Sequence, residues 1–224
     1  MEPAVGLLEI SSIAKGIEAG DAMIKRAPLD VIRAGTVHPG KYLVLVGGLT
    51  ADVEEALAAG REVAGHLLVN EVFLPDVHPD VVASMAGARR EDGGEALGVI
   101  ETLTVAATIE AADAGVKGAR VMIRDLRLAD DLGGKGYVLF GGEVAEVEAA
   151  VAYGVERVSA SSQVVTDVVI SQLHAGMREN LAADPGFGER VQDLSKAGAG
   201  VGLPPRAAAQ RRRRPLPGSG VKES

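Results

Sequence analysis

The stretch Gly6-Leu7-Leu8-Glu9 decides the fold of this 224-residue chain, because it returns as Gly98-Val99-Ile100-Glu101. Further matches are Ile17-Glu18-Ala19 with Ile109-Glu110-Ala111, Asp21-Ala22 with Asp113-Ala114, Lys25 with Lys117, and, after a two-residue insertion in the second copy, Gly40-Lys41 with Gly134-Lys135 and Gly47-Gly48 with Gly141-Gly142. Chance similarity between two amphipathic helices would not also repeat the glycines. The chain therefore holds two tandem copies of one domain.

Each copy shows the same alternation of strands and helices. In the first copy, residues 5–11 form a short apolar run typical of a buried strand. Residues 29–37 and 41–47 predict two strands joined by a turn at His38-Pro39-Gly40. A helix over 51–65, a strand over 67–74 and a short helix over 78–85 complete the copy.

The first helix of the first copy is expected to be amphipathic. Ile13, Ile17, Gly20 and Ile24 fall at helical spacing on one face. Ser11 and Ser12 precede them and can cap the helix.

The resulting order, β-α-β-β-α-β-α, predicts an α+β fold. It consists of two tandem split-βαβ, ferredoxin-like domains, each an antiparallel sheet with helices on one face. We expect the first domain at 4–86, a polar, glycine-rich linker at 87–96 and the second domain at 97–182. Residues 183–224 form a C-terminal extension, basic and partly disordered, in which 187–197 could form one more helix.

Composition excludes several kinds of protein. The chain has no cysteine, which removes disulfides, thiolate zinc sites and cysteine-ligated iron–sulfur clusters. No apolar run reaches the roughly 18 residues that cross a bilayer, and the N-terminus shows no signal-peptide pattern. We expect a cytoplasmic protein with no membrane partner.

The charge is unevenly distributed. The net charge is −8, yet residues 198–224 carry six basic residues against one acid, so the rest of the chain is at about −13. An acidic body with few aromatic residues argues against nucleic-acid binding. The run Arg211–Arg214 is most simply a solvated tail, or else a contact for an acidic partner such as an acidic enzyme.

No group of residues predicts catalysis. Glu9 and Glu101 each lie in an apolar strand, where a structural hydrogen bond explains them better than acid–base chemistry. His66, His78 and His174 lack ligand spacing and are expected at the surface or as helix caps. We therefore expect a protein that is not an enzyme and needs no cofactor.

The motifs together resemble a known family. Gly6-Leu7-Leu8-Glu9, Ser12-Ile13-Ala14-Lys15-Gly16, Asp21-Ala22-Met23-Ile24-Lys25 and His38-Pro39-Gly40-Lys41, with their counterparts in the second copy, are similar to bacterial microcompartment shell proteins. Two fused copies match the tandem-domain, trimer-forming class, which includes shell proteins of propanediol-utilisation compartments. The resemblance covers roughly residues 4–178.

This resemblance implies an assembly. Three chains would form a pseudohexameric disc, a homotrimer of six domains, and discs would tile with other shell proteins into facets around a metabolite pore. The pore residues it implies are Val37, His38, Pro39 and Gly40 from the first domain and Asp131, Leu132, Gly133 and Gly134 from the second. The edge residues it implies between discs are Lys25 and Lys117, with Asp21 and Asp113 beside them.

His38 departs from the propanediol-utilisation relatives, where a cysteine before Pro-Gly holds an iron–sulfur cluster on the threefold axis. Three imidazoles on that axis could instead hold zinc, copper or iron, or form a polar pore collar. A pore-centred metal or redox carrier is thus the alternative function. A third hypothesis is a regulator that binds a small molecule between the two copies.

Overall fold

The structure is a computed structural model, and it describes residues 4–91 and 94–183. The chain divides into two units, Met1–Ala182 and Ala183–Ser224. The expected helix over 187–197 and the run Arg211–Arg214 lie outside the described residues.

The first domain follows the predicted order of elements. They are β1 (Ala4–Ile10), α1 (Ile13–Arg26), β2 (Val31–Val37), β3 (Lys41–Gly48), α2 (Thr50–Ala64), a 3-10 turn (Gly65–Leu67), β4 (Leu68–Leu74) and α3 (Pro79–Met85). The four strands form an antiparallel sheet in the order β2-β3-β1-β4. The central strands are therefore the apolar run that opens the copy and its hairpin partner.

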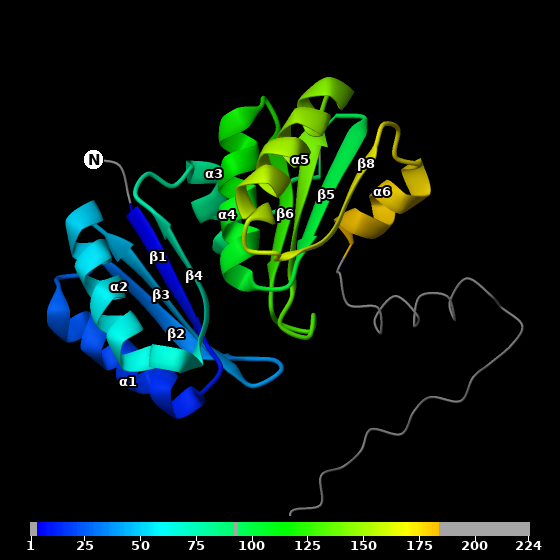
Figure 1. Cartoon of the computed structure of the whole chain (residues 1–224). Coiled ribbons are helices and arrows are strands. Elements are labelled where there is room, and N and C mark those ends of the chain that lie inside the picture. The colour runs from blue at the N-terminus through cyan, green and yellow to red at the C-terminus, as the bar shows by residue number, and fades with distance from the viewer. Residues whose placement is uncertain (1–3, 92–93, 184–224) are drawn as a thin grey trace, which may run out of the picture. The chain divides into compact units, whose positions relative to one another are not determined.

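The second domain repeats this arrangement. Its elements are β5 (Ala96–Thr102), α4 (Val105–Gly118), β6 (Met122–Leu128), β7 (Gly136–Gly142), α5 (Val144–Ser159), β8 (Val164–Ile170) and α6 (Ala175–Ala182). The sheet order is β6-β7-β5-β8, again antiparallel. Figure 1 shows α1 and α2 on one face of the first sheet and α4 and α5 in the same arrangement on the second, which confirms the predicted fold class.

The strand registers locate the two-residue insertion. Residues 37–41 join the paired residues Thr36 and Tyr42, whereas residues 129–135 join Leu128 and Gly136. The connection between these equivalent pairs is thus two residues longer in the second copy, and Val37 and Lys41 of the first copy still pair with each other. An irregularity in β6 between Ile123 and Asp125 has no counterpart in β2.

Small residues allow each helix pair to lie close to its sheet. A Cβ atom on Gly60 of α2 would lie 2.5 Å from Leu8 and 2.7 Å from Met23. The matching residue of the second domain, Gly154 of α5, is equally close to Ile100. A side chain at either position would push these neighbours aside, and at Gly154 it would also meet the backbone oxygen of Ala111 at 2.8 Å, so glycine suits the packing in both copies.

The apolar face predicted for α1 is only partly the face that packs on its own sheet. The helix buries Gly16, Ala19, Gly20 and Met23 against its own sheet. Ile13, Ile17 and Ile24 are exposed instead. Helical periodicity identified an apolar face correctly, but the first domain alone does not cover it.

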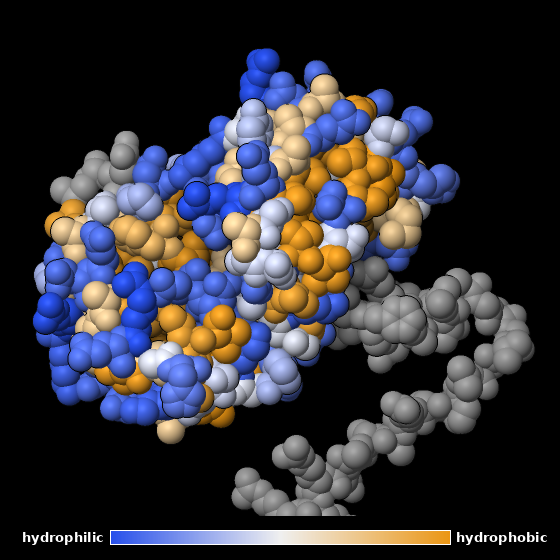
Figure 2. Space-filling model, in the orientation of Figure 1, coloured by the Kyte–Doolittle hydropathy of each residue, from blue (hydrophilic) through white to orange (hydrophobic). Residues whose placement is uncertain are grey.

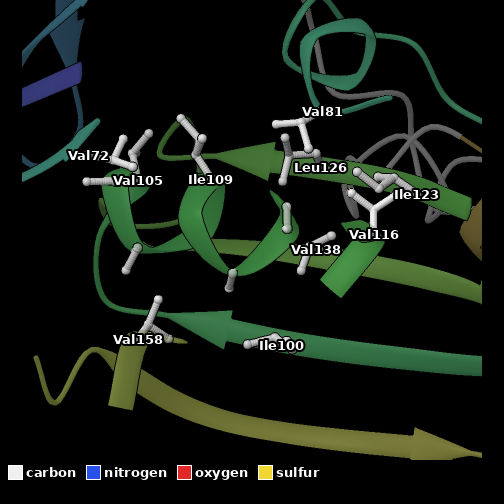
Figure 3. Packing of buried hydrophobic residues seen from close by; sticks show 14 of the residues in the cluster. Val72, Val81, Ile100, Val105, Ile109, Val116, Ile123, Leu126, Val138 and Val158 are labelled. Carbon is white, nitrogen blue, oxygen red and sulfur yellow. The ribbon is translucent and has the colours of Figure 1, made fainter. Parts of the chain in front are cut away.

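One apolar core extends across both domains. Val72 of β4 and Val81 of α3, in the first domain, belong to the same buried cluster as Val105, Ile109 and Leu126 of the second. Figure 3 shows Val72 beside Val105, and Val81 beside Leu126. The two copies are therefore joined by an apolar cluster in addition to the linker.

Candidate functional site: loops and domain-joining surfaces

The two loops predicted to line a pore lie against each other within one chain. A Cβ atom on Gly134 would be 2.9 Å from Pro39 and 3.0 Å from the backbone oxygen of His38. Gly134 also has a φ of 83°, which favours glycine. The structure thus brings the two predicted loops together, while the pore itself stays a prediction because it needs further chains.

The exposed groups differ between the loops. Val37 is half-buried, whereas His38, Pro39 and Gly40 are exposed. In the longer loop, Asp131 is exposed, with a φ of 61°. One loop therefore presents an imidazole and the other a carboxylate.

The longer loop is held by backbone hydrogen bonds. The amide of Ala129 donates to the oxygen of Lys135 at 2.9 Å, and the amide of Leu132 donates to the oxygen of Ala129 at 3.0 Å. Leu132 is half-buried and Gly133 is exposed, with a φ of 64°. This loop is a compact turn that projects polar groups.

Glu9 has the structural role that the sequence favoured. The carboxylate is fully buried and accepts a hydrogen bond from the amide of Val105, at the first residue of α4, at 3.0 Å. Lys41 donates to its other oxygen at 2.6 Å. Glu9 thus places a negative charge at the N-terminus of a helix from the other domain, where the helix dipole stabilises it.

Glu101 repeats half of this arrangement. It is paired with Lys135, as Glu9 is paired with Lys41. By the repeat, the helix corresponding to α4 is α1, which belongs to the first domain.

The predicted edge residues behave differently in the two copies. Asp113 is buried and accepts from the amide of His78, in the first domain, at 2.8 Å. Lys117 pairs with Asp113 and also donates to the backbone oxygen of Asp76. These two residues therefore join the domains of one chain.

Lys25 and Asp21 form the equivalent pair on α1, and both are exposed. Their predicted position between discs is not probed by a single chain and stays a prediction. Lys25 and Asp21 are the repeat equivalents of Lys117 and Asp113, so they present the same ammonium and carboxylate groups on an exposed helix.

The apolar surfaces show the same contrast on α1 and α4. Ile17 is 56% exposed, while its repeat equivalent Ile109 is fully buried. Ile13 and Ile24 are likewise exposed, and their equivalents on α4 are buried. The first domain covers this face of α4, and nothing among the described residues covers it on α1.

The surface that covers α4 is formed by β4 and α3 of the first domain. Its counterpart on the second domain, formed by β8 and α6, is exposed. Val72 and Val81 are 3% and 0% exposed, whereas their equivalents Val168 and Met177 are 46% and 52% exposed. Figure 2 shows apolar surface on the side of the second domain where Figure 1 places β8. Within the described residues, one copy of each surface is thus buried between the two domains, and the other copy is exposed.

The other predicted sites give simple results. His78 and His174 cap short helices through Nδ1, as expected. Among residues 4–91 and 94–183, no group of three or more potential ligands could hold a metal ion within one chain. None of the described helices is long and apolar enough to cross a membrane.

Sequence reasoning missed the two open surfaces. Their signal was present in the repeat, because an apolar residue occurs at each matching position of α1 and α4, and of β4 and β8. Which copy would be covered by the other domain depends on the tertiary arrangement.

Comparison with known proteins identifies the class. The BMC domain model matches twice, at residues 4–77 and 96–173. The chain therefore belongs to the family of bacterial microcompartment shell proteins, and it contains two such domains.

Two tandem relatives match most of the chain. Bacterial microcompartment shell protein PduT of Citrobacter freundii is 39% identical over 177 residues, which cover 79% of this chain and 96% of that protein. A microcompartment protein structure from Desulfitobacterium hafniense is 40% identical with a TM-score of 0.71, covering 80% of this chain and 99% of that one.

A shorter relative matches about half of the chain. Carboxysome shell protein CcmK1 of Thermosynechococcus vestitus is 35% identical over 108 residues, which cover 47% of this chain and 92% of that protein.

Proposed function

We propose that this chain is a structural building block, not an enzyme, that forms a closed ring of three chains in the shell of a cytoplasmic bacterial microcompartment. The proposal rests on one observation: residues that are buried between the two domains have exposed equivalents on α1 and on β8 and α6. Within the chain, β4 and α3 bind α4. Between chains, β8 and α6 would bind α1 of the next chain in the same way.

Such an interface is head-to-tail, since it joins two different surfaces. Head-to-tail contacts make rings when the rotation closes and filaments when it does not. Membership of the shell-protein family favours closure after six domains, which is three chains. Glu101 would then accept from the N-terminus of α1 of the next chain, as Glu9 accepts from α4.

The pore would lie where the loops meet. The contact of Gly134 with His38 and Pro39 places one loop from each domain side by side, and a ring would repeat this pair three times. Three exposed His38 imidazoles and three Asp131 carboxylates would face the opening. Small polar metabolites would pass through this collar.

Metal binding at His38 remains a hypothesis about the assembled ring. No single chain supplies three ligands among its described residues, so such a site would need His38 from three chains. Metal analysis of untagged protein, compared with His38→Ala, tests it. Equal and negligible metal in both proteins would remove the idea.

The ring is tested by multi-angle light scattering of the purified chain. A mass of three times 23.0 kDa is expected, with flat sheets of discs at low salt. A stable monomer at micromolar concentration would refute the ring. Encapsulated enzymes and other shell proteins as partners follow only if the ring forms.

A further inference from the structure

An apolar groove of about 350 Å³ lies on the first domain. The ends of β1, β2 and β3 and one side of α3 form its walls. Its apolar lining includes Val5, Val31, Leu45, Leu49, Val82 and Met85. Asp30 and Arg33 are its charged lining residues.

The corresponding place on the second domain is covered by the chain that follows α3. The amide of Arg90 donates to the oxygen of Arg124 on β6 at 2.9 Å. Arg89 pairs with Asp125 at 3.2 Å, and Arg124 donates to the oxygen of Glu91 at 2.6 Å. The cavity left beside this segment is about 170 Å³, half that of the first groove.

The repeat tells which segment should cover the groove of the first domain. His78 and His174 cap α3 and α6 in the same way and align the two helices. Counting onward from them, residues 89–91 after α3 correspond to residues 185–187 after α6. If α6 binds the next chain as α3 binds the second domain, the segment after α6 reaches that chain's open groove.

We propose that residues 184–187 of one chain fill the groove on the first domain of the next chain in the ring. The inference rests on the proposed ring. It adds a partner to the groove, a named segment of a second copy.

The chemistry of the two sides agrees with this partner. Arg33 and Asp125 occupy matching positions, since they pair with the equivalent residues Leu45 and Leu139. The linker offers Arg89 to the acidic Asp125. The segment after α6 has Pro185 at the matching position, and the residue before it, Asp184, offers an acidic group to the basic Arg33. In the linker contact the segment is basic and the sheet is acidic, whereas in the proposed contact the segment is acidic and the sheet is basic.

The apolar lining agrees as well. Where the linker has Glu91, the segment after α6 has Phe187. A phenylalanine suits a groove formed by Leu45 and Met85 and would bury its ring there. The segment after α6 thus differs from the linker in charge and in apolar character, and the groove of the first domain differs from its counterpart in the same two properties.

The absence of cysteine allows a direct test in the full chain. Leu45→Cys and Phe187→Cys are combined and treated with a short bismaleimide. The matched control combines Phe187→Cys with Val144→Cys, an exposed position on α5 outside the groove. Denaturing gels report the cross-link, and light scattering of the untreated proteins reports the ring.

Covalent dimers and trimers at least tenfold above the control, in a protein that is trimeric, are expected. A trimer that cross-links no better than the control would overturn the groove proposal and leave the ring intact. A monomer would overturn the ring, and the groove proposal with it. A cross-link confined within single chains would show that the segment binds its own chain, which contradicts the proposal.

A charge exchange tests the polar contact separately. Arg33→Glu in the cysteine pair should lower the cross-linked fraction several-fold. Adding Asp184→Arg should restore it, because the pair is then reversed. If the double exchange restores nothing while the ring persists, Arg33 does not bind Asp184.

Discussion

Replacing Ile17 by aspartate should separate the chains without unfolding them. The side chain is 56% exposed on α1, so in a single chain the carboxylate would stay in water. Surface substitutions of this kind usually change stability by less than about 0.5 kcal/mol. In the ring, however, Ile17 would be as buried as its equivalent Ile109.

The size of the effect follows from that burial. Full burial of an isoleucine contributes about 1.5–3 kcal/mol, so covering the exposed half of Ile17 contributes roughly 1 kcal/mol per interface. Burying a carboxylate there would add a penalty of several kcal/mol. A loss of about 4 kcal/mol weakens each interface roughly a thousandfold, and removing one chain from a ring breaks two interfaces.

Ile109→Asp is the matched control, because the same substitution then falls on the interface inside the chain. Ile109 is fully buried by the first domain, so this variant should lose about 4 kcal/mol of folding stability. Light scattering gives the mass, and urea unfolding of the diluted chains gives the stability. The reasoning is refuted if Ile17→Asp remains a trimer at micromolar concentration, or if it unfolds as readily as Ile109→Asp.

Further substitutions test the other contacts. Glu9→Ala should cost about 2–3 kcal/mol of folding stability in urea, because it leaves Lys41 and the start of α4 without their buried acceptor, whereas Glu101→Ala should weaken the trimer in light scattering and spare the fold. Gly134→Ala should lower the free energy of unfolding by about 2 kcal/mol, and Gly133→Ala by only about 1, since a Cβ meets the other loop at Gly134 alone; equal losses would argue against the loop contact.

The fold was predictable because its signals are local and repeated. Apolar runs, helical spacing and turn glycines located the strands and helices to within about two residues, and the second copy confirmed each assignment in the first. The partner of Glu9 could not be predicted in this way. Val105 lies 96 residues away, and no local pattern links a strand carboxylate to a helix in another domain.

The apolar face of α1 shows what helical periodicity can and cannot predict. Spacing of Ile13, Ile17 and Ile24 reports that one face avoids water, and it does not report what covers that face. In α4 the covering surface belongs to the same chain, and in α1 it would belong to another. A repeat inside one sequence therefore contains evidence of assembly once the burial of equivalent residues is compared.

Fusion of the two copies also determines what chemistry the proposed ring can hold. If six identical chains formed the ring, any residue placed on the axis would be repeated six times. In the proposed ring the shorter connection at 37–41 and the longer one at 129–135 would alternate, so His38 would occur three times and Asp131 three times. A fused chain lets the two loops differ in length and sequence, so a threefold site could exist on the axis while both domains share the contacts that close the ring.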